Sequence, residues 1–175
     1  LEVVFFGIGF ETTVPANAAA LLRKTPENFS LLASQKQTPP AINLLASDTN
    51  VDAFIAPGHV ATIIGTRPFE PLAENGFPVV VSGFEAKDIL LGINLLQIQV
   101  EEGISRVDNG YPRDVKPEGN EIALKVMDRV FETSESEWRG IGVIEDSGLV
   151  LRKEFEEKNA AKKLEDLYAS ALEDV

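Results

Sequence analysis

Two short stretches of this sequence place a carboxylate directly after an apolar, β-prone run. GIGFETT occupies residues 7–13 after VVFF, and SGFEAKD occupies residues 82–88 after PVVV. Glycine lets the backbone turn sharply and lets a ligand come close, and a carboxylate is favoured at the start of a helix. Glu11 and Glu85 are therefore either ordinary helix-start residues or polar groups of a site. Phe10 and Phe84 are either core residues beneath the loops or part of that site.

The only histidine, His59, directly follows Pro57-Gly58. A lone histidine is usually a hydrogen-bonded structural residue, although its place after Pro-Gly also suits a chemical role. The chain has no cysteine, which excludes disulfides, thiolate nucleophiles and iron–sulfur ligation by this chain. Zinc or iron would have to depend on carboxylates and on ligands from elsewhere, so we predict no metal site here.

The elements that must position these residues alternate along the first 104 residues. Val3 to Ile8 is a continuous apolar run typical of a strand covered on both faces. Thr12, Thr13 and Pro15 then open an Ala-rich helix. The alternation continues with strands at about 29–33, 53–56 and 78–81 and helices at about 39–46, 60–64 and 85–102. Residues 1–104 are thus predicted to form an α/β domain, a Rossmann- or flavodoxin-like open parallel sheet of about four strands with helices on both faces.

The predicted helix over 85–102 is amphipathic and closed by Gly103. Its apolar residues recur at helical spacing: Ile89, Leu90, Ile93, Leu96 and Val100.

Residues 105–175 are predicted to be an extension packed on this domain. A loop over 106–120, with Tyr111 and Val115 docking on the core, leads to a helix at 122–130. Residues 138–144 and 149–151, around Asp146-Ser147-Gly148, resemble a β-hairpin. A C-terminal amphipathic helix is expected from Leu164, Leu167, Tyr168, Ala171 and Leu172.

Loops that leave the carboxyl ends of parallel strands meet at one edge of the sheet, where ligands bind. Both Gly-Phe-Glu turns, Ser34-Gln35-Lys36 and Pro57–Val60 lie at such positions. The sequence therefore predicts that Glu11, His59 and Glu85 converge at a common rim.

Composition and missing motifs exclude several classes of function. A net charge of −12 argues against binding nucleic acid or anionic membranes, which requires a basic surface. No apolar stretch reaches the roughly 20 residues that span a bilayer, so we expect a cytoplasmic protein without a membrane segment. Thr12 stands where a third dinucleotide-binding glycine would be, and neither a P-loop nor a G-x-S-x-G motif occurs. The abrupt start at Leu1 suggests a piece of a longer protein.

Several segments resemble the hydrogenase maturation family HypD. They are VVFFGIGFETTVP, TPPA, FIAPGHVATIIG, VVVSGFEAKDIL, GN at Gly119-Asn120 and WRGIGVIEDSGLVLRKEF, with the spacing between them. The resemblance runs from residue 3 to about 157 and covers the middle to later part of the family's longer protein. It implies that this chain is that protein's central, second α/β domain.

The family is implied to act as a scaffold on which the Fe(CN)2CO centre of nickel–iron hydrogenases is assembled, together with a small HypC-like chaperone and a HypE-like protein. Its GFETT, PGHV and GFEP-x-D motifs line a central cleft. The predicted cleft and partner-binding residues of this chain are Gly9, Phe10, Glu11, Thr12, Thr13, Gln35, Pro57, Gly58, His59, Val60, Gly83, Phe84, Glu85 and Asp88.

The chain also departs from the family pattern. Ala86 replaces the proline of GFEP, Ala61 replaces a serine after PGHV, and Gln35 stands where the family often has histidine. The resemblance implies a [4Fe–4S] cluster and transient Fe(CN)2CO in the full-length protein, but the cysteine motifs are absent here, so no cofactor is predicted in this chain. Catalysis by the isolated chain is not expected.

Two interpretations therefore remain open at the level of sequence. The chain is either a scaffold domain of a maturation factor, as an excised, engineered or naturally truncated piece, or a stand-alone flavodoxin-like module without catalysis. The second would bind a protein, or a small anion at the Thr12-Thr13 helix start, where backbone N–H groups point outward.

Overall fold

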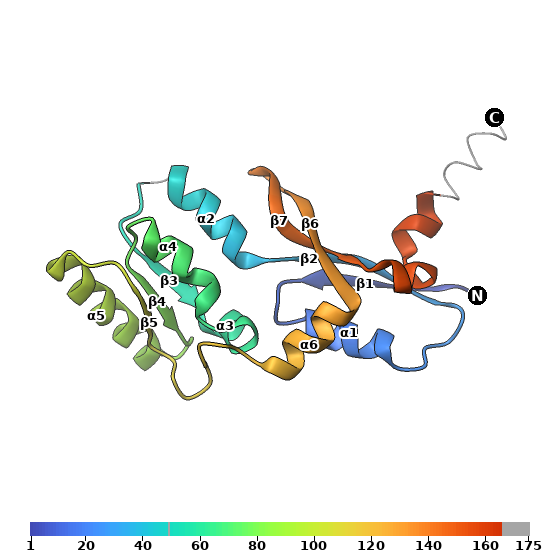
Figure 1. Ribbon diagram of the computed structural model, residues 1–175, viewed down its shortest axis with the longest axis horizontal. Helices are drawn as coiled ribbons and strands as arrows, with labels where there is room; N and C mark the ends of the chain where they lie inside the picture. The colour runs from blue at the N-terminus through green and yellow to red at the C-terminus, as the bar shows by residue number, and fades with distance from the viewer. Residues whose placement is uncertain (49, 166–175) are drawn as a thin grey trace. The chain divides into compact units, whose positions relative to one another are not determined.

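A computed structural model describes residues 1–48 and 50–165, and these divide into two compact units. The first unit combines residues 1–37 with the chain from residue 125 onward, and the second comprises residues 38–124. Each unit has its own sheet (Figure 1).

The sheet of the first unit has the strand order β1-β2-β7-β6. β1 (Val3–Gly9) and β2 (Phe29–Lys36) are parallel and are joined by α1 (Val14–Leu22). β2 pairs with β7 (Gly142–Leu151) in the antiparallel direction, and β7 forms a hairpin with β6 (Phe131–Trp138). A short 3-10 helix, η2 (Lys153–Lys158), follows the hairpin.

The first strand is less covered than its sequence predicts. β1 lies at the edge of the sheet, where β2 is its neighbour among the described strands. Its apolar side chains are exposed by about half: Val3, Val4, Phe5, Phe6 and Ile8. A continuous apolar run gives the same sequence pattern for a central strand and for an edge strand. The prediction of burial on both faces is wrong for these residues, because they are half-exposed.

The hairpin is confirmed, but its turn lies elsewhere than predicted. It occupies residues 139–141, where Gly140 has a φ of 80°. Asp146-Ser147-Gly148 instead lies within β7, opposite a register shift between Ser134 and Ser136. Asp146 adopts a φ of 54° there. An Asp-Ser-Gly sequence suits a β-bulge as well as a turn, because both need a residue with positive φ.

The second unit contains a parallel sheet with the order β3-β4-β5. Its strands are β3 (Phe54–Pro57), β4 (Val79–Ser82) and β5 (Val107–Asn109). The helices are α2 (Thr38–Asp48), α3 (Gly58–Ile64), η1 (Arg67–Phe69), α4 (Glu70–Glu74) and α5 (Ala86–Glu102). α6 (Glu121–Val130) carries the chain from the second unit back to the first.

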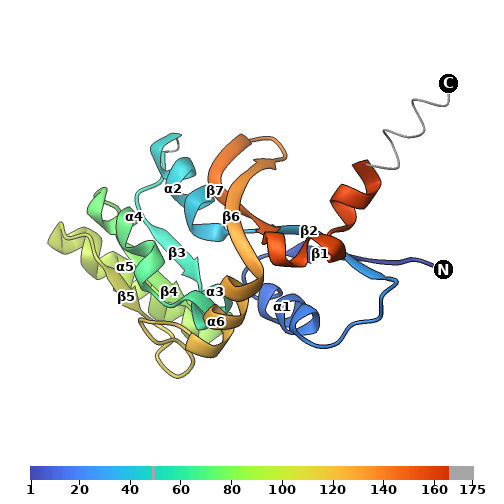
Figure 2. The same cartoon turned by 45° about the vertical axis from the view of Figure 1, so that its right-hand side comes forward.

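The central strand of this unit, β4, is covered on both faces. Val79 and Val81 point into a core formed with α2, α3, η1 and α4, whose buried members include Ala46, Ala56, Val60, Ala61, Phe69, Leu72 and Val115. Val80 points to the opposite face, where it and Ser82 lie within 4 Å of the position a Cβ would take on Gly92 of α5. Figures 1 and 2 show α5 beside this sheet, with α2 and α4 on its other side.

The buried side of α5 is not the side that apolar spacing indicates. Asp88, Gly92 and Gln99 face the unit and are buried, whereas Ile89, Leu90, Ile93 and Val100 are exposed. Gln99 bonds to the sheet, because its Nε2 donates to the carbonyl of Val79 and to Asp108 while its Oε1 accepts from the backbone of Arg106. Polar contacts and a glycine therefore dock this helix, and its apolar stripe remains uncovered.

The predicted α/β class is confirmed, with strands and helices close to the predicted positions. One difference concerns the sheets. The first two predicted strands, β1 and β2, belong to the sheet of the first unit, whereas the next two, β3 and β4, belong to the separate sheet of the second unit. The division at residues 37 and 125 also differs from the expected boundary near 104, because β6 and β7 pair with β2. Leu167, Tyr168, Ala171 and Leu172 of the predicted C-terminal helix lie outside the described residues.

We predict that Phe69→Ala lowers the free energy of unfolding by about 3–5 kcal/mol, because it leaves a cavity in a fully buried position. Urea denaturation followed by circular dichroism measures the change. The matched control is Phe84→Ala, since Phe84 is 62% exposed and should cost about 0.5 kcal/mol or less. Equal losses for the two variants would contradict the assignment of this core.

Candidate functional site

The predicted site residues form two groups, one in each unit. Gly9 to Thr13 and Gln35 follow or end β1 and β2 of the first unit, whereas Pro57 to Val60 and Gly83 to Asp88 follow β3 and β4 of the second. Within each unit the loops lie at the carboxyl ends of parallel strands, as the sequence predicts. The convergence of Glu11 with His59 and Glu85 stays a prediction, because these residues belong to different units.

The turn after β1 depends on a glycine in the left-handed region. Gly9 has a φ of 137°, and a Cβ there would lie 2.6 Å from Thr13 Oγ1. The Thr13 hydroxyl donates to the carbonyl of Phe10 at 3.0 Å, which folds the turn back on itself. This turn buries the Glu11 side chain, which is only 1% exposed. The Glu11 carboxyl group is thus held close to the start of α1, where the helix dipole favours negative charge.

Gln35, at the end of β2, is 1% exposed, and neither atom of its side-chain amide has a hydrogen-bond partner among the described residues. The amide lies beside Gly7 of β1, since a Cβ on Gly7 would be 2.8 Å from Gln35 Nε2. The same Cβ position on Gly7 would lie 3.0 Å from Nδ2 of Asn17 in α1. Leaving such an amide unpaired in a buried place costs free energy, so an additional polar group would be stabilising here.

Sequence reasoning missed an aromatic and polar cluster in the same unit. The ring of Phe10 stacks on Trp138 at 6.0 Å, and Lys36 Nζ lies 5.1 Å from the Trp138 ring centre. Lys36 also donates to Ser136 Oγ at 3.1 Å. The Trp138 indole N–H donates to the buried hydroxyl of Ser147 at 2.8 Å. No motif marks these contacts, because β2 and the hairpin are separated by about a hundred residues.

The loops of the second unit require two glycines at close approaches. A Cβ on Gly58 would lie 2.4 Å from the carbonyl oxygen of Ser82, and one on Gly83 would lie 2.2 Å from Asp88 Oδ2. Both would also collide with the ring of Tyr111. The PGH and SGF turns therefore pack against each other and against the loop that contains Tyr111.

An ion pair between a buried carboxylate and a half-exposed arginine links the loops at this corner of the unit. Arg113 donates two hydrogen bonds of 2.7 Å to the two carboxylate oxygens of Asp88, whose side chain is 4% exposed. The guanidinium carbon lies 4.3 Å from the ring centre of Tyr111. Hydrogen bonds from Arg113 hold the pKa of Asp88 below its usual value, and burial opposes this shift only in part. The sequence indicated Asp88, but nothing in the spacing identified Arg113 as its partner.

His59 and Phe84 meet at the same strand ends. Their ring centres are 4.5 Å apart and both side chains are exposed. Neither Phe84 nor Phe10 is a core residue, so the alternative that these phenylalanines fill the core beneath the loops is wrong for both. The group presents an imidazole and a phenyl ring to solvent on a rigid base.

The two Gly-Phe-Glu turns place their carboxylates differently. Glu85 is 64% exposed and pairs with Lys87 at 2.8 Å, with Arg113 at 3.7 Å. It is also the N-cap residue of α5, although its side chain makes no capping hydrogen bond. Glu85 is therefore accessible to a partner, in contrast to Glu11.

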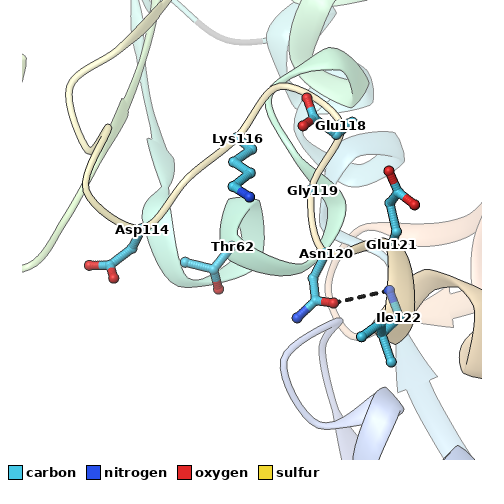
Figure 3. A pocket seen from close by; sticks show the side chains of 8 residues that line it. All are labelled: Thr62, Asp114, Lys116, Glu118, Gly119, Asn120, Glu121 and Ile122. Carbon is cyan, nitrogen blue, oxygen red and sulfur yellow. Dashed lines mark hydrogen bonds between the residues drawn. The ribbon is translucent and has the colours of Figure 1, made fainter.

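A polar hollow of about 380 Å³ lies between α3 and the loop that leads into α6, as Figure 3 shows. It is lined by Thr62, Asp114, Lys116, Glu118, Gly119, Asn120, Glu121 and Ile122. Asn120 Oδ1 accepts hydrogen bonds of 3.1 Å from the backbone of Ile122 and of Ala123, which caps α6. In the Gly119-Asn120 pair of the sequence, the asparagine thus caps the N-terminus of a helix.

Among residues 1–48 and 50–165, no three His, Cys, Asp or Glu residues are placed so that they could hold a metal ion. Over the same residues, no helix combines the length and the hydrophobicity of a membrane span.

We predict that Asp88→Asn destabilises the chain more at neutral pH than in acid. The pKa of Asp88 is lowered in the folded state, so its stabilising effect is present above the unfolded pKa of about 3.9 and is lost as pH falls through the lower folded value. Urea midpoints at several pH values should therefore converge for wild type and variant in acid. The control is Asp52→Asn, at an exposed position outside the Arg113 cluster; a difference that stays constant with pH would contradict the assignment.

We also predict that Ser147→Ala costs about 1–3 kcal/mol of unfolding free energy, because the indole N–H of Trp138 loses its acceptor. Trp138 is the only tryptophan, so its fluorescence reports the change directly. A shift in its emission maximum is expected in Ser147→Ala but not in the control Ser47→Ala, which changes an exposed serine of α2. An unchanged emission in Ser147→Ala would show that the bond does not form.

Comparison with known proteins places this arrangement in a family. Residues 1–174 match the family described as "HypD: Hydrogenase formation hypA family". A hydrogenase expression/formation protein of Methanocaldococcus jannaschii is 43% identical over 159 residues, which cover 88% of this chain and 44% of that protein. The hydrogenase maturation factor HypD of Rhodobacter capsulatus is 39% identical over 175 residues, covering 96% of this chain and 46% of that protein.

A third relative, the hydrogenase expression/formation protein HupD of Azotobacter chroococcum, is 40% identical over 174 residues, covering 93% of this chain and 46% of that protein. The chain thus spans less than half the length of these relatives. Nearly all of it is matched, including both units and both groups of loops. The resemblance expected from the sequence motifs is therefore confirmed, and the chain belongs to the HypD family.

Proposed function

We propose that this chain is a scaffold part of a hydrogenase maturation factor, and that its strand-end loops bind partner maturation proteins during assembly of the Fe(CN)2CO centre. The single observation that carries the proposal is the family match over residues 1–174. The names of the relatives describe hydrogenase maturation or formation. The iron centre is the cargo of this process and not a resident cofactor of the chain.

The loop geometry supports a scaffold role more than a catalytic one. Asp88 and Arg113 hold the second-unit loops by two short hydrogen bonds, and Gly58 and Gly83 allow them to pack without side-chain clashes. His59, Phe84 and Glu85 then project from this rigid base and are exposed. A preordered surface of this kind binds with a small loss of conformational entropy.

A HypC-like chaperone and a HypE-like protein are the partners that we propose, on the strength of the family alone. The [4Fe–4S] cluster implied for longer members does not fit this chain, because it contains no cysteine to ligate iron. We assign such a cluster, if the parent protein has one, to another part of that protein. A cytoplasmic location belongs to the same proposal.

The alternative function, anion binding by a stand-alone module at Thr12 and Thr13, is less well supported. The Glu11 side chain is buried in the turn before α1, so an acidic residue already occupies the place where the anion would have to bind. The Thr13 hydroxyl is also directed to the carbonyl of Phe10.

Titration of the chain with a HypC-like chaperone from a related organism tests the proposal by calorimetry. Glu85→Gln and His59→Ala should each weaken binding by about tenfold, or about 1.4 kcal/mol, if the exposed loop residues contact the partner. Glu74→Gln, an equivalent change on α4 away from these loops, should leave the affinity unchanged. Phosphate titration of wild type and Thr12→Val addresses the alternative.

Chaperone binding that is absent in wild type, or insensitive to both loop variants, would overturn the proposed role of these loops. Saturable phosphate binding that is lost in Thr12→Val would favour the alternative.

A further inference from the structure

Two Asn-Gly dipeptides occur in this sequence, Asn75-Gly76 and Asn109-Gly110. Asparagine is chemically labile, and a following glycine leaves the backbone nitrogen free to approach the side-chain amide. Both dipeptides have an acidic residue before them and an aromatic residue and a proline after them, in ENGFP and DNGYP. Both also lie in the second unit. The surroundings in the fold are therefore the main difference between them.

The first dipeptide is open to solvent. Asn75 and Gly76 follow the last residue of α4, and both are exposed. A Cβ on Gly76 would meet no atom within 4 Å, and Gly76 borders an open hollow of about 730 Å³. Within residues 1–48 and 50–165, no residue forms a hydrogen bond with the Asn75 side chain. This side-chain amide is therefore free to rotate and accessible to water.

A backbone hydrogen bond holds the nitrogen of Gly76 in the folded turn. Its N–H donates to the carbonyl of Ala73 at 3.0 Å. The ψ angle of Asn75 is 6° there and must rotate before its side-chain carbon can approach the Gly76 nitrogen. Both restraints belong to the exposed end of a helix of 5 residues. Helix ends fray at a small cost in free energy, so the reactive geometry is reached without unfolding of the unit.

The second dipeptide is held in place by the sheet and by its own side chain. Asn109 Nδ2 donates to the carbonyl of Val115, and Asn109 Oδ1 accepts from the backbone N–H of Tyr111, both at 2.9 Å. Gly110 is buried, and its N–H donates to the carbonyl of Val81 in β4 at 2.8 Å. A reaction at Asn109 would require these bonds to break beside the central strand. The fold thus protects this asparagine.

We propose that Asn75 is a site of spontaneous deamidation, at which isoaspartate forms as the chain ages. The Gly76 nitrogen loses its proton and attacks the side-chain carbon of Asn75. A C–N bond forms, and the side-chain nitrogen leaves as ammonia. Water then opens the resulting succinimide at either carbonyl, which gives aspartate or isoaspartate. Water is the only co-reactant, so no enzyme or partner protein takes part.

Isoaspartate at this position would disturb the junction between α4 and β4, because it adds a methylene group to the main chain. The N–H of Phe77 donates to the carbonyl of Leu72 at 3.0 Å, and the hydroxyl of Ser105 donates to the carbonyl of Gly76 at 2.8 Å. Phe77 packs on the core, with its ring centre 5.4 Å from that of Phe54. These contacts depend on the length of the chain that leads into β4. The modification should therefore destabilise the second unit.

Incubation of the chain at mildly alkaline pH, followed by mass spectrometry of its peptides, tests the site. Deamidation should be at least about tenfold faster at Asn75 than at Asn109, because opening of a sheet costs more free energy than fraying of a helix end. In urea that unfolds the chain, the two asparagines should react at similar rates. Equal rates in the folded chain, or a difference that persists in urea, would overturn the proposal.

A purified protein isoaspartate methyltransferase with labelled S-adenosylmethionine detects the isoaspartate itself. Aged wild type should be labelled, and Asn75→Gln should lose the label, because the longer side chain cyclises much more slowly. The control Asn94→Gln changes an exposed asparagine of α5 and should be labelled like wild type. Circular dichroism checks that both variants are folded. A label that persists in Asn75→Gln would place the isoaspartate elsewhere and refute the assignment.

The effect on stability is measured on the aged chain. Deamidation adds a negative charge to a chain of net charge −12, so ion exchange separates the product from fresh protein. The fraction that contains isoaspartate should unfold at a lower urea concentration than Asn75→Asp, which carries the same charge without the additional methylene group. Equal urea midpoints for the two would contradict the proposed effect on the second unit.

Discussion

The fold of the second unit depends on one short strand, β4, which is covered on both of its faces. Val79, Val80 and Val81 of β4 are all fully buried, with the α2, α3 and α4 core on one face and α5 on the other. Because β3 and β5 both run parallel to this strand, their carboxyl ends are fixed at the same edge. The loops after β3 and β4 therefore meet, and the PGH and SGF turns contact each other through Gly58 and Ser82. The burial of these three valines therefore holds in place the strand ends where the candidate site of this unit lies.

The two turns with the same Gly-Phe-Glu sequence have different structural roles. After β1, the turn buries Glu11 and places Phe10 on the only tryptophan. After β4, the turn exposes Glu85, and Asp88 three residues later takes the buried position with Arg113 as its partner. A buried carboxylate needs a compensating donor or cation, and Arg113 supplies it for Asp88. The local sequence repeats, but the surroundings bury the carboxylate at a different position of each turn.

The loops of the proposed function and the apolar stripe of α5 lie on separate surfaces of the second unit. The loops with His59, Phe84 and Glu85 follow the strand ends, whereas the stripe of Ile93, Leu96 and Val100 extends along α5 toward its C-terminal end.

The sequence by itself determined the α/β class, the position of most helices and strands, the placement of the loops at strand ends and membership of the HypD family, because apolar periodicity, glycine turns and helix caps are local features. The tertiary structure decided which strands share a sheet, since β2 pairs with β7 of the distant β6–β7 hairpin and does not share a sheet with β3. It also decided that Asp88, Gly92 and Gln99 face the sheet while the apolar side of α5 remains open. Hydrophobic spacing shows that a helix has an apolar face, but only the polar contacts of Gln99 and the close approach at Gly92 determine which face docks on the sheet.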